Sequence, residues 1–228
     1  MKRIYRKNDM GKANYGWLNT HYHFSFADYY NPDRMGFGAL RVINDDRIAP
    51  NSGFEMHPHR DMEIISYVHR GAITHKDSAG NEGRTAAGDL QVITAGTGIM
   101  HSEFNLETVE THMYQIWITP KEKNLKPSWA QAKFDHSANN PMQLLVSGDG
   151  TAPLNINQDA KLYLAKISEG ESVRHSLTGN AYLVVLDGEL SYHQEILYQG
   201  DGLELEDEDD IKLVGHTNVE LLLIELGV

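Results

Sequence analysis

The chain has 228 residues, a formal net charge of −12 and no cysteine. Its length and its 40 % apolar content suffice for one large or two small folded domains. The negative charge disfavours nucleic acid and anionic membranes as partners, and the lack of cysteine excludes disulfides, thiolate catalysis and cysteine-type zinc sites. No apolar run follows the basic first ten residues, so we expect no signal peptide, no membrane span and a cytoplasmic location.

Short segments rich in β-branched and aromatic residues recur along the chain and predict an all-β fold of barrel or sandwich type. In chain order, the expected strands are Phe37–Asn44, Glu63–Val68, Ala72–Asp77, Asp89–Gly96 and Met113–Ile118, followed by Lys161–Ile167, Ala181–Leu186, Glu189–His193, Ile211–Gly215 and Val219–Leu226. Between the two groups, the charged segment Lys121–Pro141 shows little alternation. It predicts a connection with one short helical turn at Trp129–Ala132.

The two groups of strands resemble each other in sequence. Tyr67–Ile73 (YVHRGAI) is answered by Val184–Leu190 (VVLDGEL), and Ala86–Val92 (AAGDLQV) by Tyr198–Leu205 (YQGDGLEL). A two-fold repeat of this kind predicts two related β-barrels in tandem. The expected organisation is an N-terminal domain at 1–122, a connecting segment at 123–142 and a C-terminal domain at 143–228.

Two pairs of side chains have the spacing of metal ligands. His57 and His59 lie two residues apart, and His101 and Glu103 repeat this spacing. Residues i and i+2 of a strand project from one face about 6.5 Å apart, so both members of a pair can reach one ion. If the pairs lie on neighbouring strands, three imidazoles and a carboxylate meet, which suits Fe, Mn, Co, Ni, Cu or Zn.

Spacing alone leaves alternatives open. An isolated histidine pair of this spacing is more often structural or solvated, and His21 and His23, which lack a partner pair, are an example. Strand parity makes both Glu63 and Glu103 eligible as a fourth ligand. The other reading of Glu63 is a hydrogen bond to a ligand imidazole, which such sites usually need.

Glycines frame both pairs and give the sequence a family resemblance. One set resembles the first motif of the cupin superfamily: Gly53, His57, His59, Glu63 and Gly71. A second set resembles its second motif, although Ala95 or Gly96 stands where a proline is usual: Gly88, Gly98, His101 and Asn105. From about Tyr15 to Trp117 the chain resembles the pirin family, a bicupin group whose bacterial members include quercetin 2,3-dioxygenases.

This resemblance implies two tandem cupin (jelly-roll) barrels and one divalent transition metal, Fe(II) in the first place, with Mn, Co, Ni, Cu or Zn as alternatives. The sequence HSEF matches the pirin pattern, which implies metal ligation by His57, His59, His101 and Glu103. Glu63 is kept as the alternative fourth ligand.

The second half lacks an equivalent ligand set. Counted from the matching glycines without gaps, the four ligand positions fall on Arg174, Ser176, Leu213 and Gly215. His175 and His216 lie one residue out of step, which in a continuous strand turns them to the other face. We therefore expect a C-terminal cupin-like domain without metal ligands.

The resemblance also implies a function, a dioxygenase of quercetinase type that opens the flavonol heterocycle with O2 and releases CO. Glu103 is the candidate catalytic base, and Phe54, Met56 and Phe37 are candidates for the pocket wall. The expected partners are a small flavonol and O2, with no nucleic acid and no membrane, and the protein is expected to be a monomer. Two alternatives use the same site: a non-enzymatic metal- or redox-sensing regulator that binds a protein partner, and an enzyme acting on another small phenolic.

Overall fold

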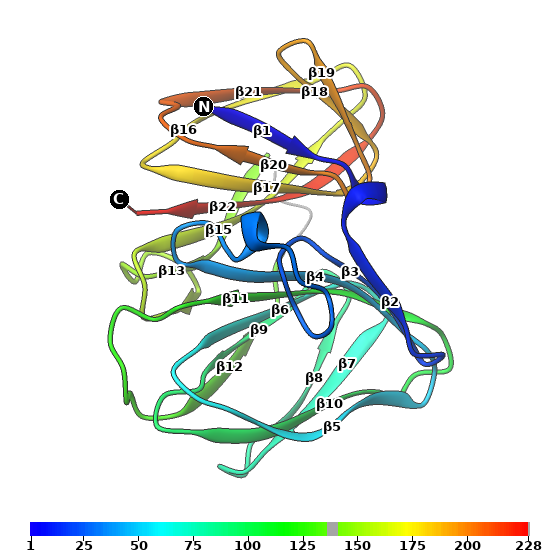
Figure 1. Ribbon diagram of the computed structural model, residues 1–228, viewed down its shortest axis with the longest axis vertical. Coiled ribbons are helices and arrows are strands. Elements are labelled where there is room, and N and C mark those ends of the chain that lie inside the picture. Colours follow the sequence, from blue (N-terminus) through cyan, green and yellow to red (C-terminus); the bar gives the residue numbers. More distant parts are fainter. Residues whose placement is uncertain (136–140, 228) are drawn as a thin grey trace. The chain divides into compact units, whose positions relative to one another are not determined.

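The computed structural model describes residues 1–135 and 141–227. They form two compact units, the N-terminal barrel (Gly11–His136 and Leu154–Gln158) and the C-terminal barrel (Met1–Met10, Ser137–Pro153 and Asp159–Val228). Within the described residues all regular structure is strand, apart from two single-turn 3-10 helices, η1 (Lys7–Asp9) and η2 (Pro32–Arg34), so the all-β prediction is confirmed (Figure 1). None of the helices in this part of the chain has the length and apolar character to span a membrane.

The N-terminal barrel consists of two antiparallel sheets. Its seven-stranded sheet has the order β12 (Ser128–Ala132), β9 (Leu90–Thr94), β6 (Glu63–Arg70), β11 (Thr111–Ile118), β4 (Leu40–Ile48), β3 (Leu18–Tyr22) and β2 (Gly11–Asn14). Its four-stranded sheet has the order β5 (Ser52–His59), β10 (Ile99–Asn105), β7 (Ala72–Asp77) and β8 (Glu82–Ala86). The short strand β14 (Leu154–Asn155) belongs to the segment 154–158 of this unit.

The C-terminal barrel repeats the arrangement. One sheet contains, in order, β1 (Lys2–Tyr5), β20 (Gly202–Leu205), β17 (Asn180–Asp187), β22 (Val219–Leu226), β15 (Ala160–Ile167) and β13 (Met142–Ser147). The other has the order β16 (Ser172–Ser176), β21 (Asp210–Gly215), β18 (Glu189–Tyr192) and β19 (Glu195–Tyr198).

The turns confirm the internal repeat. Gly71 and Gly188 have φ angles of 79° and 84°, and Gly88 and Gly200 both have 85°. The amide of Gly88 and that of Gly200 each donate to a strand carbonyl at 2.8 Å. These positive φ values favour glycine, so the same turns need the same residue in both barrels.

The structure divides the chain differently from the expected domains. β1 pairs with β20, from Lys2 opposite Leu205 to Tyr5 opposite Gly202, so the first ten residues belong to the C-terminal barrel rather than to a domain 1–122. This pairing joins residues about 200 positions apart in the chain, and local sequence patterns carry no sign of it.

The predicted connecting segment contains a strand. Ser128–Ala132 forms β12, which pairs with β9 over its full length, so the predicted helical turn at Trp129–Ala132 is wrong. Pairing to a strand edge overrides the weak local preference of this Ala-rich stretch. Residues 136–140 of the predicted segment lie outside the described part of the chain.

The interior of the C-terminal barrel is an apolar core. Sixteen buried apolar side chains form it, among them Val173 of β16 and Ile211 and Leu213 of β21. Arg174, at an expected ligand offset, is exposed. His175, expected on the other face, shares the face of Val173 and pairs through Nε2 with buried Glu225, because the gap-free count was one residue out.

Asp46 of β4 gives the fold a pH dependence. It is 2 % exposed, and burial raises its pKa from 3.8 to about 7; the nearby Thr20 hydroxyl opposes this, while nearby Asp45 and Glu103 add to it. Below its ordinary pKa this carboxyl is protonated in the folded and the unfolded chain alike. Between pH 3.8 and about 7 the carboxyl ionises in the unfolded chain before it does so in the folded chain, so this contribution to stability falls as the pH rises and is lost at about pH 7.

We therefore expect Asp46→Asn to gain stability relative to the parent protein as the pH rises from about 4 to about 7, and to keep this gain at higher pH. Urea unfolding of both proteins without metal across this range measures the difference in their free energies of unfolding. A difference that stays constant with pH would contradict this account of Asp46.

Candidate metal centre

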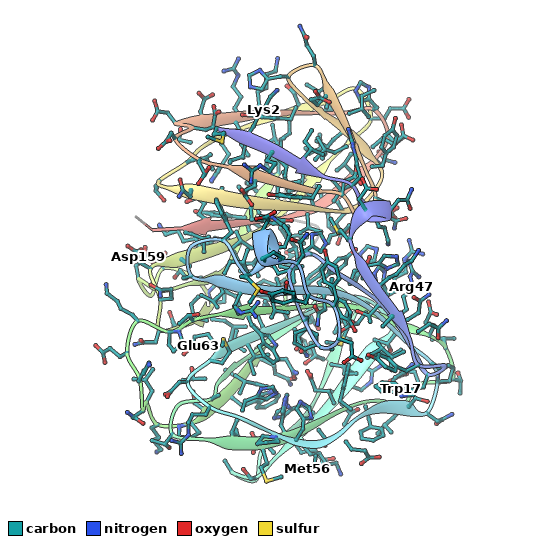
Figure 2. All side chains as sticks on the ribbon, viewed as in Figure 1. Lys2, Trp17, Arg47, Met56, Glu63 and Asp159 are labelled. Atoms are coloured by element: carbon teal, nitrogen blue, oxygen red, sulfur yellow. The ribbon has the colours of Figure 1, made fainter. Side chains whose placement is uncertain are left out.

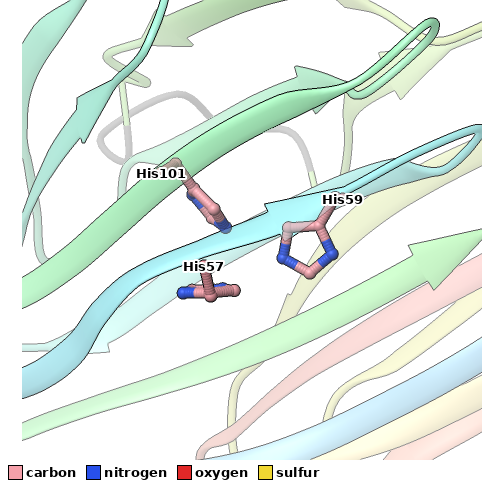
Figure 3. A group of neighbouring side chains, drawn as sticks. All are labelled: His57, His59 and His101. Carbon is pink, nitrogen blue, oxygen red and sulfur yellow. The ribbon is translucent and has the colours of Figure 1, made fainter.

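Three histidines from two neighbouring strands converge inside the N-terminal barrel (Figure 3). β5 supplies His57 and His59, β10 supplies His101, and the antiparallel pairing sets His57 directly opposite His101. One ring nitrogen from each of the three lies within 4.8 Å of the other two. The ring centroids are 4.4 Å apart for His57 and His101, and 4.9 Å apart for His59 and His101.

The register between the two strands is irregular beside this cluster. His101 pairs with His57 but Glu103 pairs with Phe54, so β5 carries one extra residue at a bulge. Gly53 allows the strands to approach beyond the bulge, because a Cβ there would lie 2.2 Å from the backbone oxygen of Glu103. The framing glycine of the sequence thus has a steric role.

Ring nitrogens of the cluster remain free to bind a metal. His57 Nδ1 donates to the backbone carbonyl of Glu55 at 2.6 Å, which leaves the lone pair on Nε2. Nε2 of His101 is buried and has no hydrogen-bond partner in the described chain. Burial and the neighbouring imidazoles lower the pKa of His59 to about 4 and that of His101 to about 3. Such a donor set fits a divalent transition metal.

Glu103 lies fully buried on the same face of β10 as His101. Its Oε1 accepts hydrogen bonds from Ser66 Oγ at 2.8 Å and Gln91 Nε2 at 2.7 Å, and its Oε2 accepts from Gln115 Nε2 at 2.7 Å. A buried carboxylate needs such partners. Since a carboxylate has about four acceptor positions, one remains, on Oε2.

Glu63 does not lie beside the three histidines. Ser66 of β6 points to Glu103, and Glu63, three residues earlier, points to the opposite face, where it accepts a hydrogen bond from Thr94 Oγ1 at 2.8 Å. Burial raises its pKa. Glu63 lies an even number of residues from His57 but does not share its face, because the chain turns between β5 and β6, with Asp61 at φ 48°.

The sequence did not reveal the side chains that hold Glu103. Ser66 pairs across the sheet with both Gln91 and Gln115. A polar residue on the inward face of each of three adjacent strands is the signal that could have identified them. Trp117 extends this network, because its indole N–H donates to Gln115 Oε1 at 3.1 Å and its ring meets His59 edge-on.

A cavity of about 640 Å³ adjoins the cluster at His57. Trp17, Phe54 and Met56 line it, as expected of Phe54 and Met56, and Figure 2 shows Trp17 and Met56 on this part of the barrel. Phe37 is buried in the fold and does not line the cavity. An aromatic and apolar wall beside polar ligands is typical of a small-molecule site.

The cluster of His57, His59 and His101 is the single group of three or more such side chains placed for a metal in residues 1–135 and 141–227. His21, His23 and the predicted fourth ligand Glu103 are not part of it. The C-terminal barrel contributes no such group among its described residues.

Both halves of the chain match family models. Residues 4–118 match the model of pirin, and residues 144–226 match that of the quercetinase C-terminal cupin domain. The two barrels are therefore cupin barrels in tandem, as the motifs indicated.

Relatives match over nearly the full length. A pirin-like protein of Caulobacter vibrioides is 45 % identical, with 95 % of each chain covered. A quercetin 2,3-dioxygenase of Escherichia coli is 41 % identical, with 97 % of this chain and 96 % of the relative covered. The crystal structure of the bacterial pirin YhhW from Escherichia coli in complex with nickel(II) superposes with a TM-score of 0.93 at 39 % identity, covering 100 % of this chain and 99 % of that one.

The two buried glutamates provide a matched test of the ligand set. We expect Glu103→Gln to weaken Ni(II) binding by at least about 10-fold, because loss of even an outer-shell partner of a metal site has an effect of this size. Glu63→Gln should leave Ni(II) binding unchanged. Competition with a chromophoric chelator measures both affinities. The reverse order, with metal binding lost in Glu63→Gln alone, would refute the assignment.

Proposed function

This chain belongs to the pirin family, and we propose that it is a metal-dependent dioxygenase of quercetinase type, which opens the flavonol heterocycle with O2 and releases CO. The observation that carries the proposal is the convergence of three imidazoles, one with a buried unpartnered nitrogen, beside a cavity with an aromatic wall. Fold and ligands alone do not choose the reaction. The name of the Escherichia coli relative, quercetin 2,3-dioxygenase, supports the quercetinase reaction.

We propose His57, His59, His101 and Glu103 as the ligands. The fourth bond would use the acceptor position left on Glu103 Oε2. We take Fe(II) as the physiological metal, and Mn, Co, Ni, Cu and Zn suit the same donor set. The nickel(II) complex of the related pirin supports metal binding without choosing among these ions.

A divalent metal at this site would lower the pKa of a flavonol 3-hydroxyl and hold the resulting anion. Glu103 would accept the hydroxyl proton at the Oε2 position that it otherwise offers to the metal, since it is the one carboxylate in the ligand set. Ser66, Gln91 and Gln115 orient that carboxylate and keep it in place as its charge changes. The electron-rich flavonolate then reacts with O2.

The cavity at His57 would hold the substrate. Trp17 and Phe54 pack edge to face with centroids 5.1 Å apart, and they offer ring faces and edges to a planar polyphenol. His101 and Glu103 have no exposure to solvent, so the buried side of the site would limit the access of water to the reactive anion. We further propose a cytoplasmic monomer whose partners are the flavonol and O2, with neither nucleic acid nor membrane among them.

We expect protein loaded with Fe(II), Mn(II) or Ni(II) to consume quercetin in air and to release CO. The loss of flavonol absorbance measures the consumption, and gas analysis measures the CO. At saturating metal, Glu103→Gln should lower kcat by about 100-fold or more, because a general base typically contributes 10²–10⁴-fold. The exposed His216 of the C-terminal barrel gives the control, and His216→Ala should retain full activity.

Equal activity of His101→Ala and the parent protein would refute the proposal. Tight metal binding without turnover of quercetin would also refute it, and would favour the metal-sensing regulator or an enzyme for another phenolic.

A further inference from the structure

His75 lies beside the three-histidine cluster but outside it. It belongs to β7, whose pairing with β10 sets His75 opposite Glu103 and Asp77 opposite His101. The His75 side chain is fully buried. Its Nδ1 lies 3.4 Å from Nδ1 of His101, and its Nε2 lies 3.1 Å from Oδ2 of Asp77. Both ring nitrogens are thus engaged by these two neighbours.

The direction of each hydrogen bond follows from the chemistry of the carboxylate. Ionised Asp77 can only accept, so Nε2 of His75 carries a proton. An imidazole with its one proton on Nε2 has its lone pair on Nδ1, so Nδ1 of His75 accepts and Nδ1 of His101 donates to it. This leaves the lone pair of His101 on Nε2, the buried nitrogen without a partner in the described chain.

Asp77 is held in place by the turn that follows β7. It accepts hydrogen bonds from the backbone N–H groups of Ala79 and Asn81 at 2.9 Å, and from Asn81 Nδ2 at 2.8 Å. Burial raises its pKa, but the hydrogen bonds from Asn81, His75 and Ala79 outweigh this and lower the pKa below its ordinary value. The carboxylate is therefore ionised and fixed.

Trp129 fixes the plane of the His75 ring. The two rings stack with centroids 5.1 Å apart and an interplanar angle of 5°. Gly83, opposite His75 on β8, makes room for the indole, because a Cβ there would lie 2.3 Å from its ring. The indole N–H also donates to Gln91, which donates to Glu103, so one tryptophan supports both parts of the site.

We propose that Asp77 and His75 are positioning residues that hold His101 with its proton on Nδ1 and its Nε2 lone pair directed at the metal. The inference rests on the metal role of His101 in the proposed function. The relay replaces the direct carboxylate–histidine contact found in many metal sites with a second imidazole between the carboxylate and the ligand.

The test compares substitutions that differ in what they offer to His101. His75→Phe keeps a ring to stack on Trp129 but removes the acceptor, and Asp77→Asn removes the charge that fixes the proton on His75. We expect each to weaken Ni(II) binding by about 10- to 100-fold, the usual effect of losing an outer-shell partner. His75→Gln offers an amide oxygen in place of Nδ1 and should recover part of the affinity. Lys76→Gln is the control, because Lys76 lies between these residues with its side chain exposed.

A second readout reports on the proton itself. In Co(II)-loaded protein, the N–H protons of ligating imidazoles give strongly shifted exchangeable proton NMR signals. The signal that disappears in His101→Ala should exchange slowly with D2O in the parent protein and fast in His75→Phe and Asp77→Asn. Thermal unfolding of the variants shows whether they are folded, and a purely structural role would not change this one signal selectively.

Unchanged affinity and slow exchange in both His75→Phe and Asp77→Asn would overturn the relay. Complete loss of metal in His75→Phe with normal binding in Asp77→Asn would also overturn it, because His75 would then be a ligand. Failure of the proposed function looks different: metal affinity and the NMR signal would respond as expected, while no variant, nor the parent protein, would consume quercetin.

Discussion

The pairing of β10 between β5 and β7 is the constraint on which the site depends. Its register sets His57 opposite His101 on one side and Asp77 opposite His101 on the other. Because side chains alternate between the faces of a strand, a slip of one residue on β10 would turn His101 and Glu103 out of the barrel. The bulge and the close approach at Gly53 fix this register, and the register decides which side chains meet at the site.

The two barrels show what distinguishes a site from a core in one fold. In the N-terminal barrel Ser66 pairs with Gln91 and Gln115, and these three side chains surround a buried carboxylate. At the corresponding pairs of the C-terminal barrel, Leu183 faces Leu203 and Leu223. All three leucines belong to the apolar core. Exchange of a polar lining for leucine thus leaves a barrel that packs well and offers no ligands.

Much of this was readable from the sequence, because strand patterns, turn glycines and the spacing of His57, His59 and His101 are local features. Counting odd and even positions from His57 cannot decide between Glu63 and Glu103, because a turn separates β5 from β6 and the alternation of side chains starts anew after it. The local sequence around Trp129 predicts a helical turn, but its pairing with β9 makes it part of the sheet. The roles of His75 and Trp129 depend on contacts between strands distant in the chain, which no local pattern encodes.

We propose that His57, His59, His101 and Glu103 surround a single metal ion inside the N-terminal barrel. Anomalous X-ray scattering at the nickel edge, from crystals of the protein loaded with Ni(II), tests it most directly. The account predicts one strong peak between the three imidazoles and Oε2 of Glu103. A peak beside Glu63, or an ion bound by the histidines with Glu103 turned away, would contradict it.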